Sequence, residues 1–466
     1  MLPDDVLLEI FDNHVNEDRD EYDDFKQETE EWQTLVHVCR RWRSVVFASP
    51  RRLNLRLVCT PETPARDMLD VWPSLPLLVW DSLSAHSTEG VDDIIAVLER
   101  SKRVVEINLF QADNSDLEEV LAAMQVPFPE LTVLLLRSSD GKVSALPDSF
   151  LGGSAPRLQS FTLFRIPFPG LSKFLLSTTH LFSLYLDNIP HSGYISPKEI
   201  VTALSTCASL AELTLVFESP RSRPHWASRP PPPVTRSVLP ALMSFAFKGV
   251  GEYLDDVVAR IDTPQLVRLE TTFFNQIVFD TPQFIQFISR MPTLKTYERA
   301  LVVFENGTAS FILSSRTSDY GCLKVKIPCI ELDWQISSME QVCTSCLPPL
   351  STSEDLYIYE LPSSPPVWQD NIENALWLEL LHPISAVKNL YLSEKFASRI
   401  VPALQERRTT EITVLPALQN IFLEELQPSG LVQKGIQQFV ATRQATGNPI
   451  AVSRWDNSKQ DMVRFY

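Results

Sequence analysis

A short leucine-centred string recurs along most of this chain, and its repetition restricts the folds that the sequence can adopt. The string has the form Pro-x-Leu-x-x-apolar, and its copies are PSLPLL (73–78), PELTVL (129–134), PRLQSF (156–161), PALMSF (240–245), PQLVRL (264–269), PTLKTY (292–297) and PALQNI (416–421). Chance would supply about two copies in a chain of this composition. A further match, PGLSKF (169–174), falls out of register, so the spacing carries more weight than the string itself.

The spacing becomes regular when three related strings are included, namely VVEINL (104–109), LFSLYL (181–186) and LAELTL (210–215). The leading apolar residues then follow one another at intervals of 23 to 32 residues, at positions 75, 104, 131, 158, 181, 210, 242, 266 and 294. Each leads a short alternating pattern, L-x-x-L-x-L, that is typical of a strand. Amphipathic helix candidates precede several of these strands, at 91–101, 116–124, 196–207 and 281–291.

One strand and one helix in a unit of this length is the arrangement of leucine-rich repeats. We therefore predict an α/β fold with a degenerate leucine-rich-repeat-like array over residues 60–466, in which parallel strands form one sheet and helices cover its outer face. α/β layers of another topology are the alternative. The Asn that usually follows the strand is missing, which predicts an irregular solenoid. That slot holds Ala112, Ser139, Ile166, Ile189, Glu218 and Val250.

Beyond residue 300 the register of the repeats loosens. The strings CIELDW (329–334) and VKNLYL (387–392) predict strand starts, and NALWLELL (374–381) predicts a helix. The segment 430–447 reads as a terminal amphipathic helix that ends at Gly447. Such a helix would cap the array.

Two amphipathic stretches precede the array, and the first contains LPDDVLLEIF (2–11). It places Val6, Leu7, Ile10 and Phe11 at helical spacing after Pro3. The second predicts a helix over residues 32–47 that is apolar around more than half of its circumference. Two short helices cannot bury such wide apolar faces against each other. The surplus must pack against the rest of the chain or against another protein, and both alternatives stay open at this point.

The ordered residues in LPDDVLLEIF…LVHVCRRWRSV resemble the F-box, over residues 2 to about 50. The array behind them is similar to the degenerate leucine-rich repeats that follow F-boxes in fungal proteins. The resemblance implies a helical module, here residues 1–55, that docks onto the Skp1-like adaptor of a cullin-RING ubiquitin ligase. The resemblance also implies that nine residues belong either to the core of this module or to its contact with the adaptor. They are Leu2, Pro3, Leu7, Leu8, Ile10, Phe11, Val38, Cys39 and Trp42.

Two insertions depart from these patterns. The acidic insertion 16–31 holds nine acids and predicts a solvated loop, or else a tag that tunes the adaptor contact or attracts a basic partner. The Pro- and Arg-rich segment 219–237 predicts an extended loop between two repeats. It is either a plain surface loop or a contact patch for a protein substrate, and the residues of that patch would be Arg221, Arg223, Trp226 and Arg229.

No motif assigns a catalytic residue, a cofactor or a metal. The pair CTSC (343–346) has no second pair to complete a zinc site, and the seven histidines form no metal-binding spacing. The acid pair Asp255 and Asp256 reads as the solvated side of a helix. A net charge of −17 argues against nucleic acid as a ligand. We therefore predict a protein that is not an enzyme.

With the repeats behind it, the resemblance to the F-box implies the substrate-recognition subunit of a Skp1-cullin-F-box ligase, which also holds an unknown protein substrate on its array. The alternatives are a repeat scaffold without a degradative role and, as a less favoured reading, an enzyme built from scattered residues.

The first ten residues hold acids and no Lys or Arg, unlike a signal peptide. No apolar run reaches about 18 residues, as a membrane span requires. The seven cysteines make no disulfide framework, so we expect a cytoplasmic or nuclear protein.

Overall fold

The computed structural model of this chain describes residues 2–16, 31–61, 65–81, 88–110, 114–220, 233, 235–274, 280–294, 297–315, 321–345, 347, 350–369, 372–405, 414–424 and 430–455. Its contacts divide the chain into two units. The first comprises residues 1–195 with 206–209, and the second comprises residues 196–205 with 210–466.

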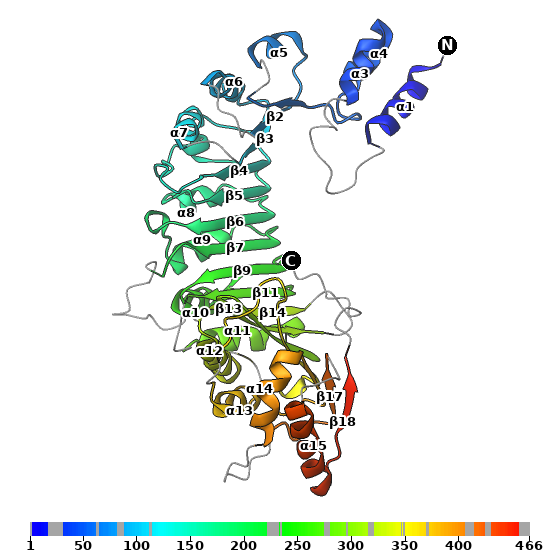
Figure 1. The fold of residues 1–466 in the computed structure, drawn as a ribbon. Coiled ribbons are helices and arrows are strands. Elements are labelled where there is room, and N and C mark those ends of the chain that lie inside the picture. The colour runs from blue at the N-terminus through cyan, green and yellow to red at the C-terminus, as the bar shows by residue number, and fades with distance from the viewer. Residues whose placement is uncertain are drawn as a thin grey trace. The chain divides into compact units, whose positions relative to one another are not determined.

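In its described residues the first unit opens with helices α1, α3 and α4, and it continues as a parallel sheet of strand order β1-β2-β3-β4-β5-β6. Figure 1 shows these strands stacked as successive rungs, with helices α6, α7 and α8 along one side of the stack. The elements are α1 (Asp4–Asn16), α3 (Glu31–Val38), α4 (Arg40–Ala48), β1 (Leu57–Cys59), α5 (Ala65–Val71), β2 (Leu77–Asp81), α6 (Thr88–Leu98), β3 (Val104–Leu109), α7 (Asn114–Ala123), β4 (Val133–Arg137), η1 (Phe150–Gly153), β5 (Ser160–Phe164), α8 (Leu171–Leu175), β6 (Ser183–Ile189) and η2 (His191–Gly193).

The second unit holds a sheet of strand order β7-β9-β11-β14-β13-β12-β15-β16-β17-β18, and β8 pairs with β10 beside it. Its elements are α9 (Pro197–Leu204), β7 (Glu212–Phe217), β8 (Ser237–Val238), β9 (Ser244–Gly249), α10 (Gly251–Arg260), β10 (Ile261–Asp262), β11 (Arg268–Phe273), α11 (Pro282–Arg290), η4 (Pro292–Leu294), β12 (Arg299–Glu305), β13 (Thr308–Ser314), β14 (Cys322–Pro328), α12 (Leu332–Ser345), η5 (Leu350–Thr352), β15 (Asp355–Glu360), α13 (Asn374–Leu381), β16 (Asn389–Leu392), α14 (Glu394–Gln405), β17 (Asn420–Leu423), α15 (Gly430–Ala445) and β18 (Ala451–Arg454).

The leading leucines of the repeats are buried where the spacing predicts. Leu131, Leu158 and Leu181 each stand two residues before a strand and are inaccessible to solvent. Within β4, Leu134 and Leu136 are also buried, because alternate side chains of a strand point to the same face. The other leading leucines placed in this way are Leu75, Leu210, Leu242 and Leu266. The predicted α/β solenoid of leucine-rich repeats, with parallel strands and flanking helices, is thus confirmed.

An antiparallel strand interrupts the parallel array after Leu294. The next strand, β12, lies parallel to β15 but is separated from β11 by β13 and β14. β12 and β13 pair in antiparallel fashion around Asn306 and Gly307, and Gly307 takes a φ of 78°. This Asn-Gly dipeptide is a common two-residue hairpin loop, because Gly adopts a positive φ without strain. β13 then pairs antiparallel to β14, and β14 lies parallel to β11. The strand start predicted at 329–334 is wrong, since this segment leads into α12.

The parallel pattern resumes after the insertion. The helix predicted at 374–381 is α13, the string at 387–392 contains β16, and the helix predicted at 430–447 is α15. Gly447 follows α15 with a φ of 81°. Strand β18 comes after this helix, so the helix is not the last element of the array as the sequence suggested.

Asp255 corrects the interpretation of the acid pair on α10. Its side chain is only 2% exposed, and its Oδ1 accepts hydrogen bonds from the backbone N–H groups of Gln283 at 2.8 Å and Phe284 at 2.9 Å. These two groups lie in the first turn of α11, where N–H groups lack partners within the helix. Asp255 therefore caps a neighbouring helix of the array, a contact that helical periodicity alone does not reveal.

We expect Asp255→Ala to lower the free energy of unfolding of the second unit by about 2 kcal/mol, because one buried and one part-buried N–H group lose their acceptor. Asp256→Ala serves as the matched control. It should change the free energy by less than about 0.5 kcal/mol, because Asp256 lies partly exposed on the same helix. Urea denaturation followed by tryptophan fluorescence measures both. Equal losses in the two variants would contradict the capping role.

Candidate functional site

The N-terminal helices carry the residues that resemble the F-box, and α1 divides them between two faces. Leu7 and Phe11 are buried, at 5% and 1% exposure, and the ring of Phe11 lies 4.8 Å from the ring of Trp42 on α4. Leu8 and Trp42 are partly buried. Leu7 and Phe11 therefore belong to the core between the helices, with Trp42 packed against them.

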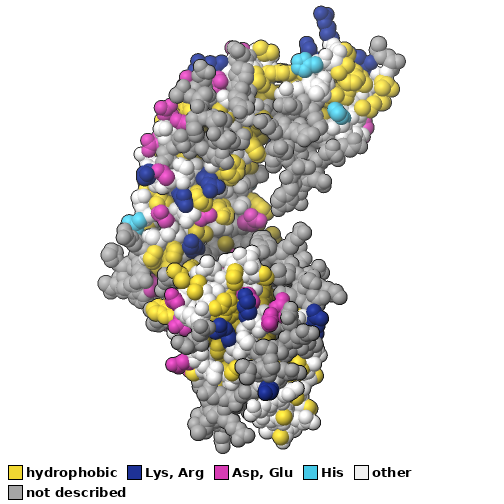
Figure 2. Space-filling view, in the orientation of Figure 1, with side chains coloured by type: hydrophobic (Ala, Val, Ile, Leu, Met, Phe, Trp, Pro, Cys, Tyr) yellow, Lys and Arg dark blue, Asp and Glu magenta, His cyan; other side chains and the backbone are white. Residues whose placement is uncertain are grey.

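A neighbouring face of α1, one residue around the helix from Leu7 and Phe11, is apolar and exposed. Leu2, Val6 and Ile10 are 51%, 42% and 47% exposed. Their spacing of four residues places Val6 and Ile10 one above the other on the helix, with Leu2 just before its first turn. We call these three residues the α1 stripe. Figure 2 shows hydrophobic side chains gathered over the N-terminal helices.

Sequence reasoning placed Leu2 and Ile10 among the candidates and missed Val6, although the four-residue spacing could have found it. Of the remaining candidates, Pro3, Val38 and Cys39 are exposed. The structure thus sorts the predicted residues into inward and outward sets. Their contact with an adaptor stays a prediction.

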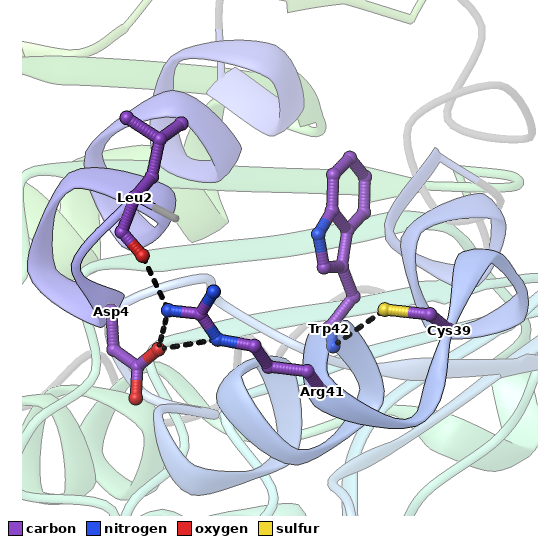
Figure 3. Close-up of polar contacts among 5 residues, drawn as sticks. All are labelled: Leu2, Asp4, Cys39, Arg41 and Trp42. Atoms are coloured by element: carbon purple, nitrogen blue, oxygen red, sulfur yellow. Dashed lines mark hydrogen bonds and ion pairs between the residues drawn. The ribbon is translucent and has the colours of Figure 1, made fainter.

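A break at Cys39 corrects the single helix that was predicted over 32–47. Cys39 has an extended backbone, with φ −160° and ψ 166°, which separates α3 from α4. Its Sγ accepts a hydrogen bond from the backbone N–H of Trp42 at 3.4 Å, so the thiol caps the start of α4 (Figure 3). The break leaves Val38 and Cys39 at an exposed corner, with Val38 59% exposed.

Arginines brace α1 against the elements that follow it. Arg41 donates to the Asp4 carboxylate, with an Nη2–Oδ1 distance of 2.7 Å, and to the backbone oxygen of Leu2 (Figure 3). Arg52 pairs with Glu9, and its Nε lies 3.8 Å from Oδ2 of Asp12. These pairs are exposed, so each contributes less than about 1 kcal/mol. Their contribution is to orient α1 and the backbone at Leu2.

An aromatic cluster anchors the other side of the helices to the first repeats. Trp32 is 2% exposed, and its ring centroid lies 5.4 Å from that of Trp72 and 6.2 Å from that of Phe47. The indole N–H of Trp32 donates to the backbone oxygen of Arg56 at 3.2 Å. Trp72 directly follows α5. The apolar surface of the N-terminal helices is therefore divided in two. One part packs on the first repeats through Trp32, and the other part, the α1 stripe, stays exposed.

Two predicted regions lie outside the described residues. Of the acidic insertion 16–31, the structure describes only Asn16, which ends α1, and Glu31, which begins α3. In the Pro- and Arg-rich segment, the four residues proposed for substrate contact are likewise not described, namely Arg221, Arg223, Trp226 and Arg229.

The described part of the chain contains no group of three or more His, Cys, Asp or Glu side chains that could hold a metal ion. Cys343 of the CTSC pair is buried on α12. No helix within the described ranges is long and apolar enough to cross a membrane.

Two buried cysteines have thiols that resist ionisation. Burial raises the pKa of the Cys59 and Cys322 thiols to about 11, because removal from water disfavours the thiolate.

We expect iodoacetamide at pH 8 to modify exposed Cys39 at least about 100-fold faster than Cys59 or Cys322. A thiol with a pKa of about 11 is about one part in a thousand thiolate at this pH, and only the thiolate attacks. Timed quenching and mass spectrometry of the tryptic peptides measure the three rates. In denaturant the rates should become equal. Equal rates in the folded chain would contradict the placement of Cys39 at an exposed corner.

The chain resembles a solved repeat protein but matches no family model. A scan against protein-family models found no match, and a search of curated proteins found none either. Among solved structures, the leucine-rich repeat-containing protein LegL7 from Legionella pneumophila is similar at 13% sequence identity and a TM-score of 0.27. That match covers 83% of this chain and 97% of the other.

Proposed function

We propose that helices α1, α3 and α4 dock onto the Skp1-like adaptor of a cullin-RING ubiquitin ligase, and that the repeats hold a protein substrate. The observation that carries this proposal is the α1 stripe, an apolar row that remains exposed while the other side of the helices is anchored through Trp32. Exposed apolar patches of this kind typically mark contacts with another protein. The resemblance to the F-box in residues 2–50 supports the same partner.

In this role the chain contributes proximity rather than chemistry. The docked adaptor brings the ligase, the repeats bring the substrate, and the shared chain raises the effective concentration of one near the other. The described residues gather no metal-binding cluster, and the proposal requires none.

Titration of the purified full chain with purified Skp1 in a calorimeter tests the proposal. We expect a one-to-one complex with a dissociation constant of about 1 μM or lower, as for a specific protein interface. The absence of heat and of co-elution in size-exclusion chromatography, with a chain that is folded by circular dichroism, would overturn it.

A binding scaffold without a degradative role is the second candidate. It is favoured by exposed aromatic side chains on the repeats of the first unit, which could hold a partner whether or not an adaptor is bound. Phe110, Phe182 and Tyr185 are 41%, 50% and 39% exposed. The half-life of a captured partner, measured in cells with and without this chain, separates the two candidates. A shorter half-life in its presence supports the ligase role, and an unchanged one supports the scaffold.

A further inference from the structure

A group of cations lies on one face of the second unit's sheet, across strands β9, β11 and β14. The opposite face is covered by helices, since Phe247 of β9 stacks on Tyr253 of α10 at 6.0 Å and Phe273 of β11 meets Phe284 of α11 at 6.3 Å. Alternate side chains must therefore point away from the helices. On these strands they include the residues that we call the basic strip, namely Lys248, Arg268, Lys324 and Lys326.

The strand register brings these cations close together. Lys248, Thr272 and Lys326 lie opposite one another in one row across β9, β11 and β14, and Lys324 precedes Lys326 by two residues on the same face. Neighbouring strands are about 4.8 Å apart, so the backbones of Lys248 and Lys326 are about 10 Å apart. At this spacing, carboxylates on one short peptide segment could contact both lysines.

The positive charge of the basic strip is only partly compensated. Arg268 is occupied by Glu270 on the same strand, with an Nη2–Oε1 distance of 2.6 Å. Among the described residues, no carboxylate lies within 4.0 Å of the ammonium groups of the three lysines. Lys324 is 8% exposed, and its pKa is lowered by burial and then by the charge of Lys326, while Glu270 opposite it on β11 offsets part of this effect. An anion at this place would offset both effects, because it stabilises the charged ammonium.

Apolar side chains continue the same rows beyond the basic strip. Lys324 is followed across the sheet by Ile312, Leu301 and Tyr357. Lys326 is followed by Ser310 and then by Val303 and Tyr359. Ile312, Val303 and Tyr357 are buried, and Leu301 and Tyr359 pack against the cluster that includes Ile312 and Val303. Leu301 and Tyr359 are partly exposed. A partner at this face would therefore meet the partly exposed Lys248 and Lys326 at one end and the partly exposed Leu301 and Tyr359 at the other.

We propose that the basic strip binds an acidic peptide segment of the protein substrate, with carboxylates on the partly exposed Lys248 and Lys326 and neighbouring apolar side chains against Leu301 and Tyr359. The proposal rests on the proposed role of the repeats as a protein-binding surface, and it is independent of adaptor docking. A peptide fits better than nucleic acid, because the net charge of −17 repels a long polyanion and the apolar rows suit side chains.

Fluorescence anisotropy with the full chain tests this proposal. The probe is a fluorescein-labelled octapeptide, Glu-Leu-Glu-Glu-Leu-Glu-Glu-Leu, and the control probe has Gln in place of every Glu. We expect the double variant Lys248→Gln, Lys326→Gln to bind the acidic probe about 10-fold more weakly, since two cations are lost from the contact. The matched control is Lys198→Gln, Lys434→Gln, which removes two exposed lysines from helices and should bind as the unchanged chain does.

Stronger binding of the acidic probe than of its Gln counterpart, lost in the strip variant alone, supports the proposal. Equal binding of the two probes, or an unchanged strip variant, overturns it. Tighter binding of a DNA oligonucleotide of equal charge at the same lysines also overturns it, in favour of nucleic acid. The strip variant should still bind Skp1. A chain that binds Skp1 and ignores the acidic probe would therefore refute this inference and leave adaptor docking intact.

Discussion

Val6→Asp should weaken adaptor binding at least about 100-fold while the helices stay folded. Val6 lies in the middle of the α1 stripe, between Leu2 and Ile10, and its side chain is 42% exposed in the free chain. An adaptor that covers the stripe would bury the new carboxylate in an apolar contact without a partner, which costs at least about 3 kcal/mol. Calorimetric titration with Skp1 measures the loss, and far-ultraviolet circular dichroism reports on the helices.

Val126→Asp supplies the matched control for this experiment. Val126 follows α7 in the same unit and is 45% exposed, so the two substitutions differ in place rather than in chemistry or in exposure. The control should bind Skp1 like the unchanged chain. If Val6→Asp and Val126→Asp bind equally well, the α1 stripe is not the adaptor contact, and the docking proposal loses the observation on which it rests.

Trp32→Ala should detach the N-terminal helices from the first repeats, with a loss of about 3 to 5 kcal/mol in local stability. Trp32 fills the space beside Phe47 and Trp72, and it also donates to the backbone oxygen of Arg56. Truncation removes both the packing and the hydrogen bond. Hydrogen exchange in α3 and α4, read by mass spectrometry, should accelerate in the variant while exchange in β4 to β6 stays unchanged.

Trp32→Phe is the control, because it keeps an aromatic ring in the cluster and removes mainly the indole N–H. We expect it to cost about 1 to 2 kcal/mol, well below the alanine variant. Unchanged exchange in α3 and α4 of Trp32→Ala would mean that the helices are held by other contacts. Adaptor binding by that variant is a separate measurement, since a detached module could still dock.

The sequence alone does not show which apolar residues of the N-terminal helices face outward. The period of a helix shows which residues share a face, and on that basis Leu7 and Phe11 were grouped with Ile10. It does not show which face a neighbour covers. Packing of Phe11 against Trp42 and of Trp32 against Trp72 assigns the inward sides and leaves Leu2, Val6 and Ile10 exposed. Candidate contact residues therefore follow from tertiary contacts, with periodicity as the first filter.

The repeats themselves were predictable because their signal is local. A leucine two residues before an alternating strand must be buried wherever the strands stack, and Leu131, Leu158 and Leu181 meet this rule. The insertion β12–β13–β14 was not predictable in the same way. A strand in an antiparallel hairpin has the same two-residue period as one in a parallel array, so the pattern cannot identify the neighbour with which it pairs.

The sequence by itself determined the α/β class, the repeat length, most of the helices and the amphipathic start of the chain, since each depends on spacings within about 30 residues. Only the tertiary structure decided the partners of distant residues. Asp255 caps a helix that begins 27 residues later, and Lys248 shares a row with Lys326 across three strands. The physical reason is that capping, charge clustering and burial depend on what lies opposite a side chain, and the fold brings those groups together.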